Sequence, residues 1–316
     1  MWKIALLLVL TLIVVPIVTY RFDVPLTELQ TTALWSVGMI YLVSALLCYV
    51  VSTITKNYSQ VDKLWSINPV IYAWVVCYYS AWEDRIVLMA ILVTIWGIRL
   101  TYNFSRRNGY SWKFWEGEED YRWAILQARP EFQAAWKWSI FNLLFISLYQ
   151  MGLILLFTLP ILKSMNGVPL EITDYVLAAI FLGFVLYETI ADQQQWTFQN
   201  EKHRLIAAGT PLPDKYKKGF VGEGLWALSR HPNYAAEQAI WIVFYLFSVV
   251  ATGVWINWTI AGCLLLLILF KSSSDFSEGI SEGKYPEYKD YQKKVGRFLP
   301  KIFPNSSNKE RQEALD

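Results

Sequence analysis

The stretch Gln238–Phe270, QAIWIVFYLFSVVATGVWINWTIAGCLLLLILF, contains 33 residues and no charged side chain. A single α-helix of that length would measure about 50 Å, whereas the hydrocarbon core of a bilayer is about 30 Å thick. One helix would therefore overshoot the membrane, and Ala251-Thr252-Gly253 offers a turn near the middle of the stretch. We expect two membrane-spanning helices joined by a tight hairpin.

Comparable apolar runs occur along the whole chain, in which 55% of the residues are hydrophobic and only 17% are charged. The other runs are Ile4–Tyr20, Thr32–Thr53, Leu64–Trp82, Ile86–Asn103, Trp138–Leu162 and Tyr175–Trp196. Each is long enough to cross a bilayer as a helix. The fold class that follows is all-α, a polytopic membrane helix bundle with about 7–8 transmembrane helices. The first run is also compatible with a cleaved signal peptide, but it lacks a clear small-residue cleavage site, which favours a retained helix.

The basic residues indicate how these helices are oriented. With the N-terminus in the cytoplasm, 24 of the 28 Lys and Arg residues fall on the cytoplasmic side, and only Arg21, Arg85 and Lys163 fall on the other. Such a bias is typical of a correct topology. We expect a multi-pass integral membrane protein with both termini cytoplasmic, in the endoplasmic reticulum if eukaryotic or the inner membrane if bacterial. The net charge of +2 gives no indication of nucleic-acid binding.

Three parts of the chain follow from this topology. Residues 1–137 are expected to form N-terminal membrane helices and a cytoplasmic loop, residues 138–304 a membrane core that carries the functional motifs, and residues 305–316 a disordered tail.

A stripe of polar side chains lies on the sixth apolar run. Glu188, Asp192, Gln195 and Gln199 are spaced i, i+4, i+7 and i+11, which places them on one helical face. A carboxylate at the centre of a membrane costs about 2.5–3.5 kcal/mol on insertion scales, so such residues normally face a polar cavity or a partner. The stripe therefore predicts a polar site, although a solvated helix end would explain it too.

The run Ser229-Arg230-His231-Pro232-Asn233-Tyr234, followed by Glu237, forms a second cluster. Arginine offers a rigid fork of donors for phosphate, and the other side chains add directional hydrogen bonds. Proline suits the first turn of a helix, where backbone amides favour an anion. We interpret the cluster as a binding site; the alternative is an interfacial anchor.

The third cluster is Tyr285-x-x-Tyr288-x-x-Tyr291, followed by Arg297 and Phe298-Leu299-Pro300. Four lysines surround it: Lys284, Lys289, Lys293 and Lys294. Taken alone, this segment is equally typical of a basic amphipathic helix that lies on anionic membrane lipids.

The second and third clusters together resemble a known pattern. Gly-Leu-Trp-x-x-Ser-Arg-His-Pro-Asn-Tyr-x-x-Glu, followed by a membrane helix and Tyr-x-x-Tyr…Arg-Phe-Leu-Pro, is similar to the C-terminal domain of the steroid 5α-reductases. The chain looks still more like a membrane family that shares this domain, because residues 57–66, 96–100 and 117–123 match that family as well. The resemblance is nearly full length.

The resemblance implies that NADPH binds on the cytoplasmic side and that the C-terminal segment folds back on the cofactor site. By position, Asp192 matches an acidic cofactor ligand, and Tyr291 and Arg297 match phosphate and adenosine contacts. His231, Asn233, Tyr234 and Glu237 match the family's cofactor-binding core. We add Arg230 for phosphate, and Glu188 and Gln195 from the polar stripe. No Gly-x-Gly-x-x-Gly fingerprint is present, so the site would not be Rossmann-like.

Two positions depart from the family pattern. Ala236 stands where the family often has glycine before the motif glutamate, and Gln199 or nearby Lys202 stands where a basic residue is common. These changes put the phosphate geometry and the cofactor preference in question.

The implied reaction is NADPH-dependent reduction of a carbon–carbon double bond in a lipid-like sterol, prenoid or fatty enone, a role in lipid metabolism. Such a reduction requires an acid that polarises the carbonyl group. The family's motif for this acid does not map cleanly here, and our catalytic candidates are Asp62, Glu119, Asp120 and Tyr121. No metal is expected.

Two other functions remain open. Isoprenylcysteine-type membrane methyltransferases share an Arg-His-Pro-x-Tyr helix and a glutamate but use S-adenosylmethionine; Asp192 and the Tyr285–Pro300 segment favour the reductase. A non-enzymatic lipid-binding or transport protein is the third hypothesis, although transporters more often show repeats and broken helices.

Overall fold

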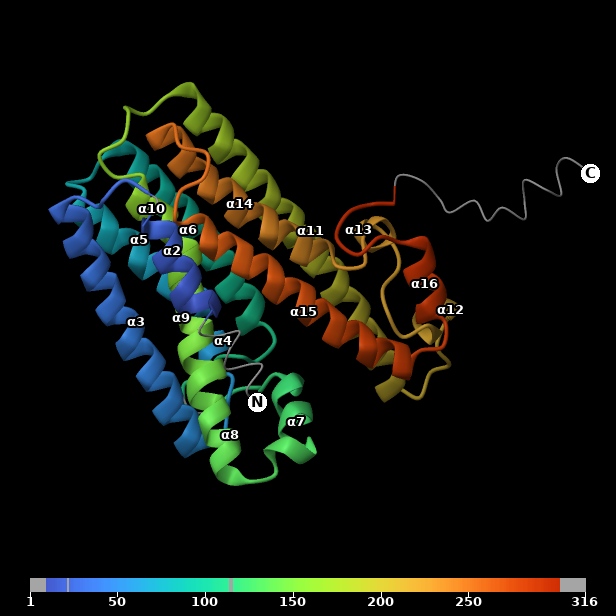
Figure 1. Ribbon diagram of the computed structural model, residues 1–316. Coiled ribbons are helices and arrows are strands. Elements are labelled where there is room, and N and C mark those ends of the chain that lie inside the picture. The colour runs from blue at the N-terminus through green and yellow to red at the C-terminus, as the bar shows by residue number, and fades with distance from the viewer. Residues whose placement is uncertain (1–9, 22, 114–115, 302–316) are drawn as a thin grey trace, which may run out of the picture. The chain divides into compact units, whose positions relative to one another are not determined.

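The computed structural model describes residues 10–21, 23–113 and 116–301 (Figure 1). Throughout these ranges the regular structure is helical, and no strand is present apart from an isolated bridge between Ser229 and Gly296. The all-α prediction is therefore confirmed. The predicted tail, residues 305–316, lies outside the described part of the chain.

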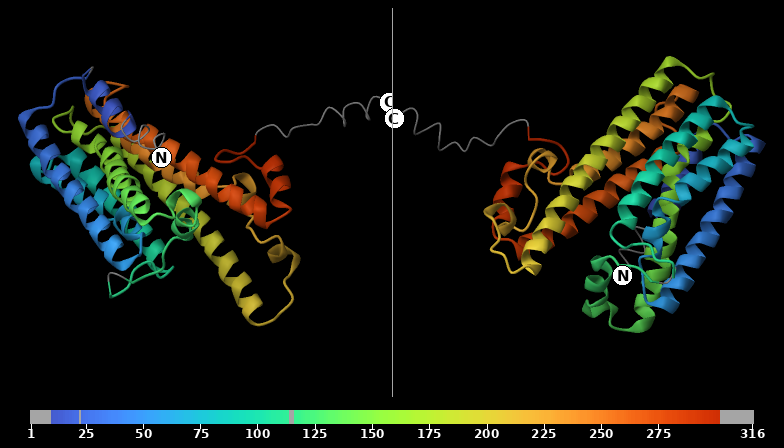
Figure 2. Two further views of the ribbon diagram at one scale, coloured as in Figure 1. Left: turned by 60° about the horizontal axis from the view of Figure 1, so that its bottom comes forward. Right: turned by 180° about the vertical axis from the view of Figure 1, so that it is seen from behind.

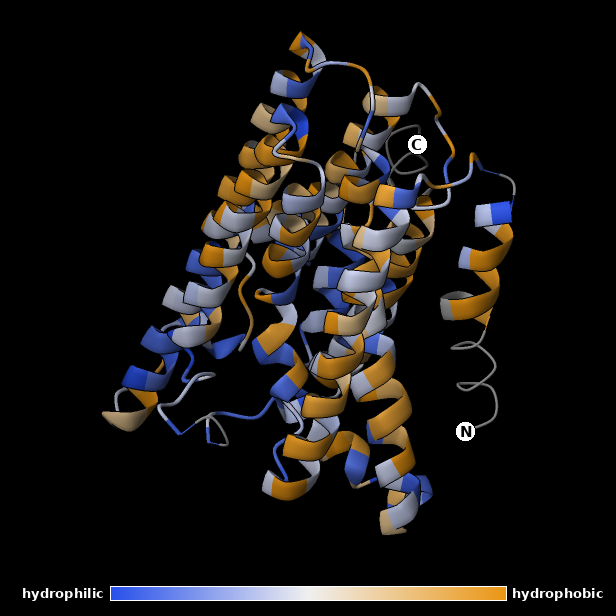
Figure 3. Cartoon of the chain, turned by 90° about the vertical axis from the view of Figure 1, so that its left-hand side faces the viewer, coloured by the Kyte–Doolittle hydropathy of each residue, from blue (hydrophilic) through white to orange (hydrophobic). Residues whose placement is uncertain are grey.

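Six helices among the described residues are long and apolar enough to cross a membrane, which makes the chain a multi-pass membrane protein. They are α3 (Glu28–Thr55), α6 (Asp84–Ser105), the composite helix Ala135–Lys163, α11 (Ile172–Ala207), α14 (Pro232–Thr252) and α15 (Ile260–Lys284). The composite helix joins α8 (Ala135–Phe141), the π-helix η3 (Asn142–Tyr149), α9 (Gln150–Thr158) and α10 (Pro160–Lys163). Hydrophobic residues predominate along these helices (Figure 3).

The expected count of 7–8 spans is therefore slightly too high. Leu64–Trp82 does not form one helix but divides into α4 (Gln60–Trp65) and α5 (Asn68–Tyr79). Pro69 lies in the first turn of α5 and begins a new helix there, and 12 residues reach only about 18 Å. The first apolar run lies partly outside the described residues, which begin with η1 (Leu10–Val14) and α2 (Val15–Arg21).

The predicted hairpin at the end of the chain is confirmed. Helix α14 ends at Thr252, Gly253 takes a φ of +71° in the turn, and α15 begins at Ile260. Asn257 organises the turn, because its side chain donates to Ser248 Oγ at 3.0 Å and accepts from Thr259 Oγ1 at 2.6 Å. The turn thus meets its own polar groups without a charged residue.

The chain divides into two compact units. Unit 1 comprises Met1–Gly183 and Ile240–Ile268, and unit 2 comprises Phe184–Ala239 and Leu269–Asp316. Helices α11, α14 and α15 contribute residues to both.

The core of unit 1 is aromatic. The ring of Trp241 lies 4.9 Å from that of Trp96 and 4.1 Å from that of Phe157, and all three side chains are fully buried. Within this unit α14 and α15 lie side by side (Figure 2), and Cys263 Sγ approaches the carbonyl oxygen of Trp241 at 3.3 Å. Burial of such rings supplies the largest apolar contribution per residue.

Two buried ion pairs also hold unit 1 together. Arg85 Nε lies 2.8 Å from Asp174 Oδ1, and Lys163 Nζ lies 2.8 Å from Asp23 Oδ1. Each pair joins segments that are far apart in the sequence.

Candidate functional site

The Arg-His-Pro-Asn-Tyr motif lies where an extended segment turns into a helix. Ser229 is extended, with φ −141° and ψ 143°, and Pro232 begins α14. Arg230 N donates to the carbonyl oxygen of Gly296 at 2.8 Å, and His231 N donates to that of Arg297 at 3.0 Å. The C-terminal segment after α16 (Tyr288–Lys294) therefore folds back onto the motif, as expected.

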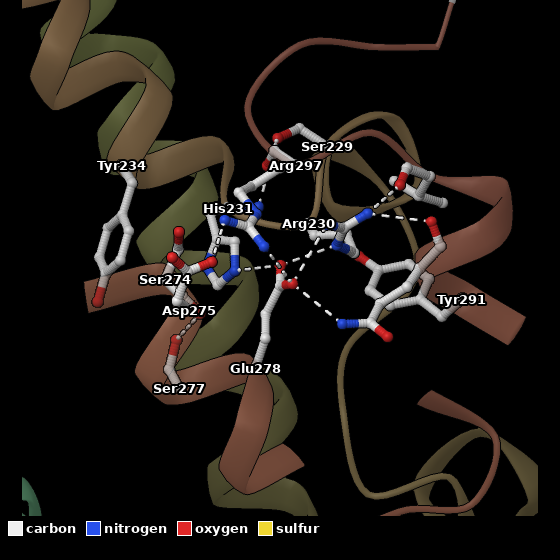
Figure 4. Close-up of polar contacts among 12 residues, drawn as sticks. Ser229, Arg230, His231, Tyr234, Ser274, Asp275, Ser277, Glu278, Tyr291 and Arg297 are labelled. Atoms are coloured by element: carbon white, nitrogen blue, oxygen red, sulfur yellow. Dashed lines mark hydrogen bonds and ion pairs between the residues drawn. The ribbon is translucent and has the colours of Figure 1, made fainter. Parts of the chain in front are cut away.

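A single carboxylate organises the side chains of this region (Figure 4). Glu278, on α15, is only 2% exposed. Its oxygens accept hydrogen bonds from Arg230 Nε at 2.8 Å, His231 Nε2 at 2.9 Å, Gln292 Nε2 at 3.0 Å and Arg297 Nη2 at 3.1 Å. Arg297 is also paired with Asp275. Charge-assisted bonds of this kind are the strong ones in proteins.

Arg230 does not present a free guanidinium group. Besides Glu278, it donates to the carbonyl oxygens of Gln292, at 3.1 Å, and Val295. Its side chain thus fastens the C-terminal segment to the motif. A phosphate would bind Arg230 only by exchange with these contacts.

The acidic stripe of α11 meets the motif at one point. Asn233 Nδ2 donates to Asp192 Oδ1 at 3.0 Å. Glu188 and Glu237 are also buried, and Gln195 Oε1 is buried without a partner in the described part of the chain. A buried oxygen of this kind is suited to a donor group of a ligand.

The aromatic candidates pack in two places. The Tyr234 ring stacks on His231 at 5.2 Å and lies 4.9 Å from Phe270. Tyr291 donates its hydroxyl hydrogen to the carbonyl oxygen of Trp226. Burial raises the pKa of Tyr291, so the phenol stays protonated and remains a donor. In this arrangement Tyr291 holds the C-terminal segment in place.

Three of the four catalytic candidates lie together in unit 1. Tyr58 N donates to Glu119 Oε1 at 2.6 Å, and Asp120 N donates to Ser59 Oγ at 2.9 Å. Trp123 Nε1 lies 3.4 Å from Asp62 Oδ2. The segments 57–66 and 117–123, which the sequence analysis treated separately, are thus partners. Tyr121 is not part of this group, because its side chain is 54% exposed.

The carboxyl groups of this cluster differ in their pKa values. Burial, and then the charge of Asp120, raise the pKa of Asp62 to about 6. Burial also raises the pKa of Glu119. Burial opposes ionisation of Asp120, but hydrogen bonds from Arg122 at 2.7 and 2.9 Å outweigh it and lower the Asp120 pKa. Asp62 is therefore the group best suited to carry a proton near neutral pH.

Comparison with known proteins gives a family. The sequence model of the family described as "Protein of unknown function (DUF1295)" matches residues 48–295. The chain belongs to the DUF1295 family. A Schizosaccharomyces pombe protein described as uncharacterized is 36% identical over 267 residues, which cover 80% of this chain and 75% of the yeast protein. No solved structure matches.

The match covers nearly every candidate residue of this DUF1295 protein. Only Arg297 lies beyond its end, two residues after the last matched position. Across the described ranges, no group of three or more His, Cys, Asp or Glu residues is arranged to hold a metal ion.

The residues that the sequence analysis missed in this DUF1295 protein are Glu278, Asp275 and Gln292. Asp275 and Glu278 are three residues apart at the end of an apolar helix, which resembles a solvated terminus. The available signal was the pairing arithmetic: two arginines, Arg230 and Arg297, flank buried motifs and require carboxylate partners.

Proposed function

We propose that the protein is a membrane-embedded, NADPH-dependent reductase of a carbon–carbon double bond in a lipid-like enone. The observation that supports it is the joining of the Arg-His-Pro-Asn-Tyr motif to the Tyr-x-x-Tyr…Arg-Phe-Leu-Pro segment in unit 2. These two segments carry the resemblance to the steroid 5α-reductase C-terminal domain. They lie more than 50 residues apart in the sequence, so their contact is not a consequence of chain proximity.

The polar groups of unit 2 suit a dinucleotide in kind. Asp192 and Asn233 offer a carboxylate and an amide, which are typical partners of ribose hydroxyls and carboxamides. Arg230 and Arg297 would contact phosphate after exchanging part of their bonds to carboxylates and carbonyls. NADPH would supply the hydride when bound. The protein's own contribution would be to orient the cofactor and to exclude water.

The acid of the reaction is a separate part of the proposal. Reduction of an enone develops negative charge on the carbonyl oxygen, and a protonated carboxyl group can donate a hydrogen bond to it. Asp62 meets this requirement, because its pKa is raised to about 6 and part of the population keeps its proton at neutral pH. Asp62 would act as the proton donor, with Glu119 and Asp120 shaping its surroundings.

A methyltransferase is the second candidate, and one feature of unit 2 favours it. S-adenosylmethionine carries a sulfonium cation, and the carboxyl groups of Glu188, Asp192 and Glu237 are all buried there. Both candidates would act from the cytoplasmic face, since the distribution of Lys and Arg supports cytoplasmic termini in an endoplasmic reticulum or bacterial inner membrane.

Cofactor titration tests the proposal. Protein purified in micelles should bind NADPH saturably, read from its intrinsic tryptophan fluorescence. His231→Ala should weaken binding, whereas His203→Ala, which removes the other histidine from an exposed position, should not. Saturable binding of S-adenosylmethionine without NADPH binding would refute the reductase. Binding of neither would favour the non-enzymatic lipid-binding or transport hypothesis.

Turnover tests the acid. The wild type should oxidise NADPH in the presence of one member of a panel of sterol, prenoid and fatty enones. Asp62→Asn should abolish this turnover and leave NADPH affinity unchanged, because its side chain keeps the shape but has no acidic proton. Equal turnover by Asp62→Asn would remove Asp62 from the mechanism.

A further inference from the structure

Five hydrogen-bond donors in unit 2 converge on the carboxylate of Glu278. Oε1 accepts from Arg230 Nε at 2.8 Å and from His231 Nε2 at 2.9 Å. Oε2 accepts from Gln292 Nε2 at 3.0 Å, Arg297 Nη2 at 3.1 Å and Arg230 Nη2 at 3.2 Å. A carboxylate offers about four lone-pair sites, so donors saturate this group. An ionised carboxylate has no hydrogen to donate in return.

We propose that Glu278 is a positioning residue that fixes which nitrogen of His231 carries the hydrogen. Because the carboxylate only accepts, Nε2 of His231 must be protonated to make the 2.9 Å bond. In the neutral ring Nδ1 is then an acceptor. Within the described residues Nδ1 makes no hydrogen bond, so its lone pair is available to a ligand.

This assignment names the ligand chemistry at His231. A group that binds an acceptor must itself donate, so the ligand atom facing Nδ1 belongs to an amide, amine or hydroxyl group and not to a phosphate or carboxylate. The inference rests on the proposed function, where the matching group is the carboxamide NH₂ of a nicotinamide. It assigns the phosphate contacts elsewhere than to His231.

The same carboxylate joins His231 to the C-terminal segment. Gln292 and Arg297 belong to that segment, whereas Arg230 and His231 belong to the motif, and Glu278 accepts from all four. Glutamine in place of Glu278 would turn one of the two acceptor oxygens into a donor. If Oε1 were replaced, the bonds from His231 and Arg230 Nε would be lost; if Oε2 were replaced, the bonds to the C-terminal segment would be lost.

Histidine NMR tests the proposal directly, because the chain contains only His203 and His231. Protein labelled with ¹⁵N-histidine in micelles would be recorded at alkaline pH, where a histidine ring is neutral. We expect one ring, assigned with His203→Ala, to be locked with Nε2 protonated and Nδ1 bare. Exposed His203 should show the mixture of tautomers typical of solvent. A His231 ring with Nδ1 protonated would overturn the proposal, and this result needs no Glu278 variant to fold.

A pair of matched variants tests the consequence for binding. Glu278→Gln should weaken NADPH binding by about tenfold or more, the loss expected for charge-assisted hydrogen bonds. Glu282→Gln is the control, since Glu282 lies one turn further along the same helix and accepts from Gln292 at 2.7 Å but from neither arginine nor histidine. It should bind NADPH as the wild type does. Equal affinity of Glu278→Gln and wild type would overturn the positioning role. A wild type that does not bind NADPH would overturn the proposed function, while the tautomer would still decide the assignment at Glu278.

Discussion

Replacement of Arg85 by methionine should strongly destabilise unit 1. Arg85 and Asp174 are 4% and 0% exposed. Arg85 Nε and Nη2 each donate to the Asp174 carboxylate at 2.8 Å, and Nη1 and Nη2 donate to the carbonyl oxygens of Val168 and Pro169. In Arg85→Met the carboxylate would stay buried with only the Glu171 backbone amide, at 2.8 Å, as a donor.

The contacts that are lost set the magnitude. Removal of one partner of a buried ion pair costs about 3–5 kcal/mol, because the remaining charge is left without compensation. The two carbonyl groups lie at a more exposed loop and add little. For a unit of this size we expect the melting temperature to fall by on the order of 10 °C. The reading would be thermal unfolding in micelles, followed by tryptophan fluorescence.

Two further variants make the test specific. Lys113→Met removes an exposed pair, with Glu116 at 3.1 Å, and should cost less than about 1 kcal/mol. The double variant Arg85→Met/Asp174→Leu should recover most of the loss, because no unpaired charge remains. A single variant within about 1 kcal/mol of wild type, or a double variant no more stable than the single, would refute the reasoning.

Three other predictions follow from the structure. Because the pKa of Asp62 rises from 3.8 to about 6, the native state binds this proton more tightly than the unfolded chain does; the wild type should therefore lose stability relative to Asp62→Asn as pH rises through that window in thermal melts. Gly262→Ala would bring a methyl group within 2.3 Å of a neighbouring backbone carbonyl and should cost at least about 1–3 kcal/mol in the same melts, whereas Gly183→Ala meets nothing within 4 Å and should be neutral or slightly stabilising. A cysteine introduced at Thr210 should react with a membrane-impermeant maleimide from the cytoplasmic side and one at Val168 only from the other; the reverse pattern would contradict the orientation.

The helices were largely predictable because a bilayer imposes a length on each span. The terminal hairpin is the clearest example: 33 uncharged residues exceed one span, and Gly253 permits the positive φ of the turn. The run Leu64–Trp82 was misjudged because average hydropathy does not register a break. Asn68-Pro69 begins a new helix there, and a proline in a first turn is a local signal that the average conceals.

The candidate site was predictable only where it is contiguous in the sequence. The Arg-His-Pro-Asn-Tyr motif stands out because five unusual residues are adjacent. Glu278 does not, since its importance comes from donors that are 14 to 48 residues away and meet only in the folded chain. On its own helix it is one of several carboxylates that follow an apolar run, a pattern that solvation alone explains.

The two clusters also differ in how their charges balance, and this difference bears on their roles. Around Asp62 the nearest charges are another carboxylate, Asp120, and a single guanidinium group, so the Asp62 pKa is raised and a proton can be held. Around Glu278 there are two guanidinium groups and a histidine that donates to it. Where two environments treat carboxyl groups in opposite ways, the one that keeps its proton is the candidate acid and the other serves as a fixed charge. That contrast assigns proton donation to the cluster in unit 1 and ligand positioning to the cluster in unit 2, which is why Asp62→Asn and Glu278→Gln should separate turnover from binding.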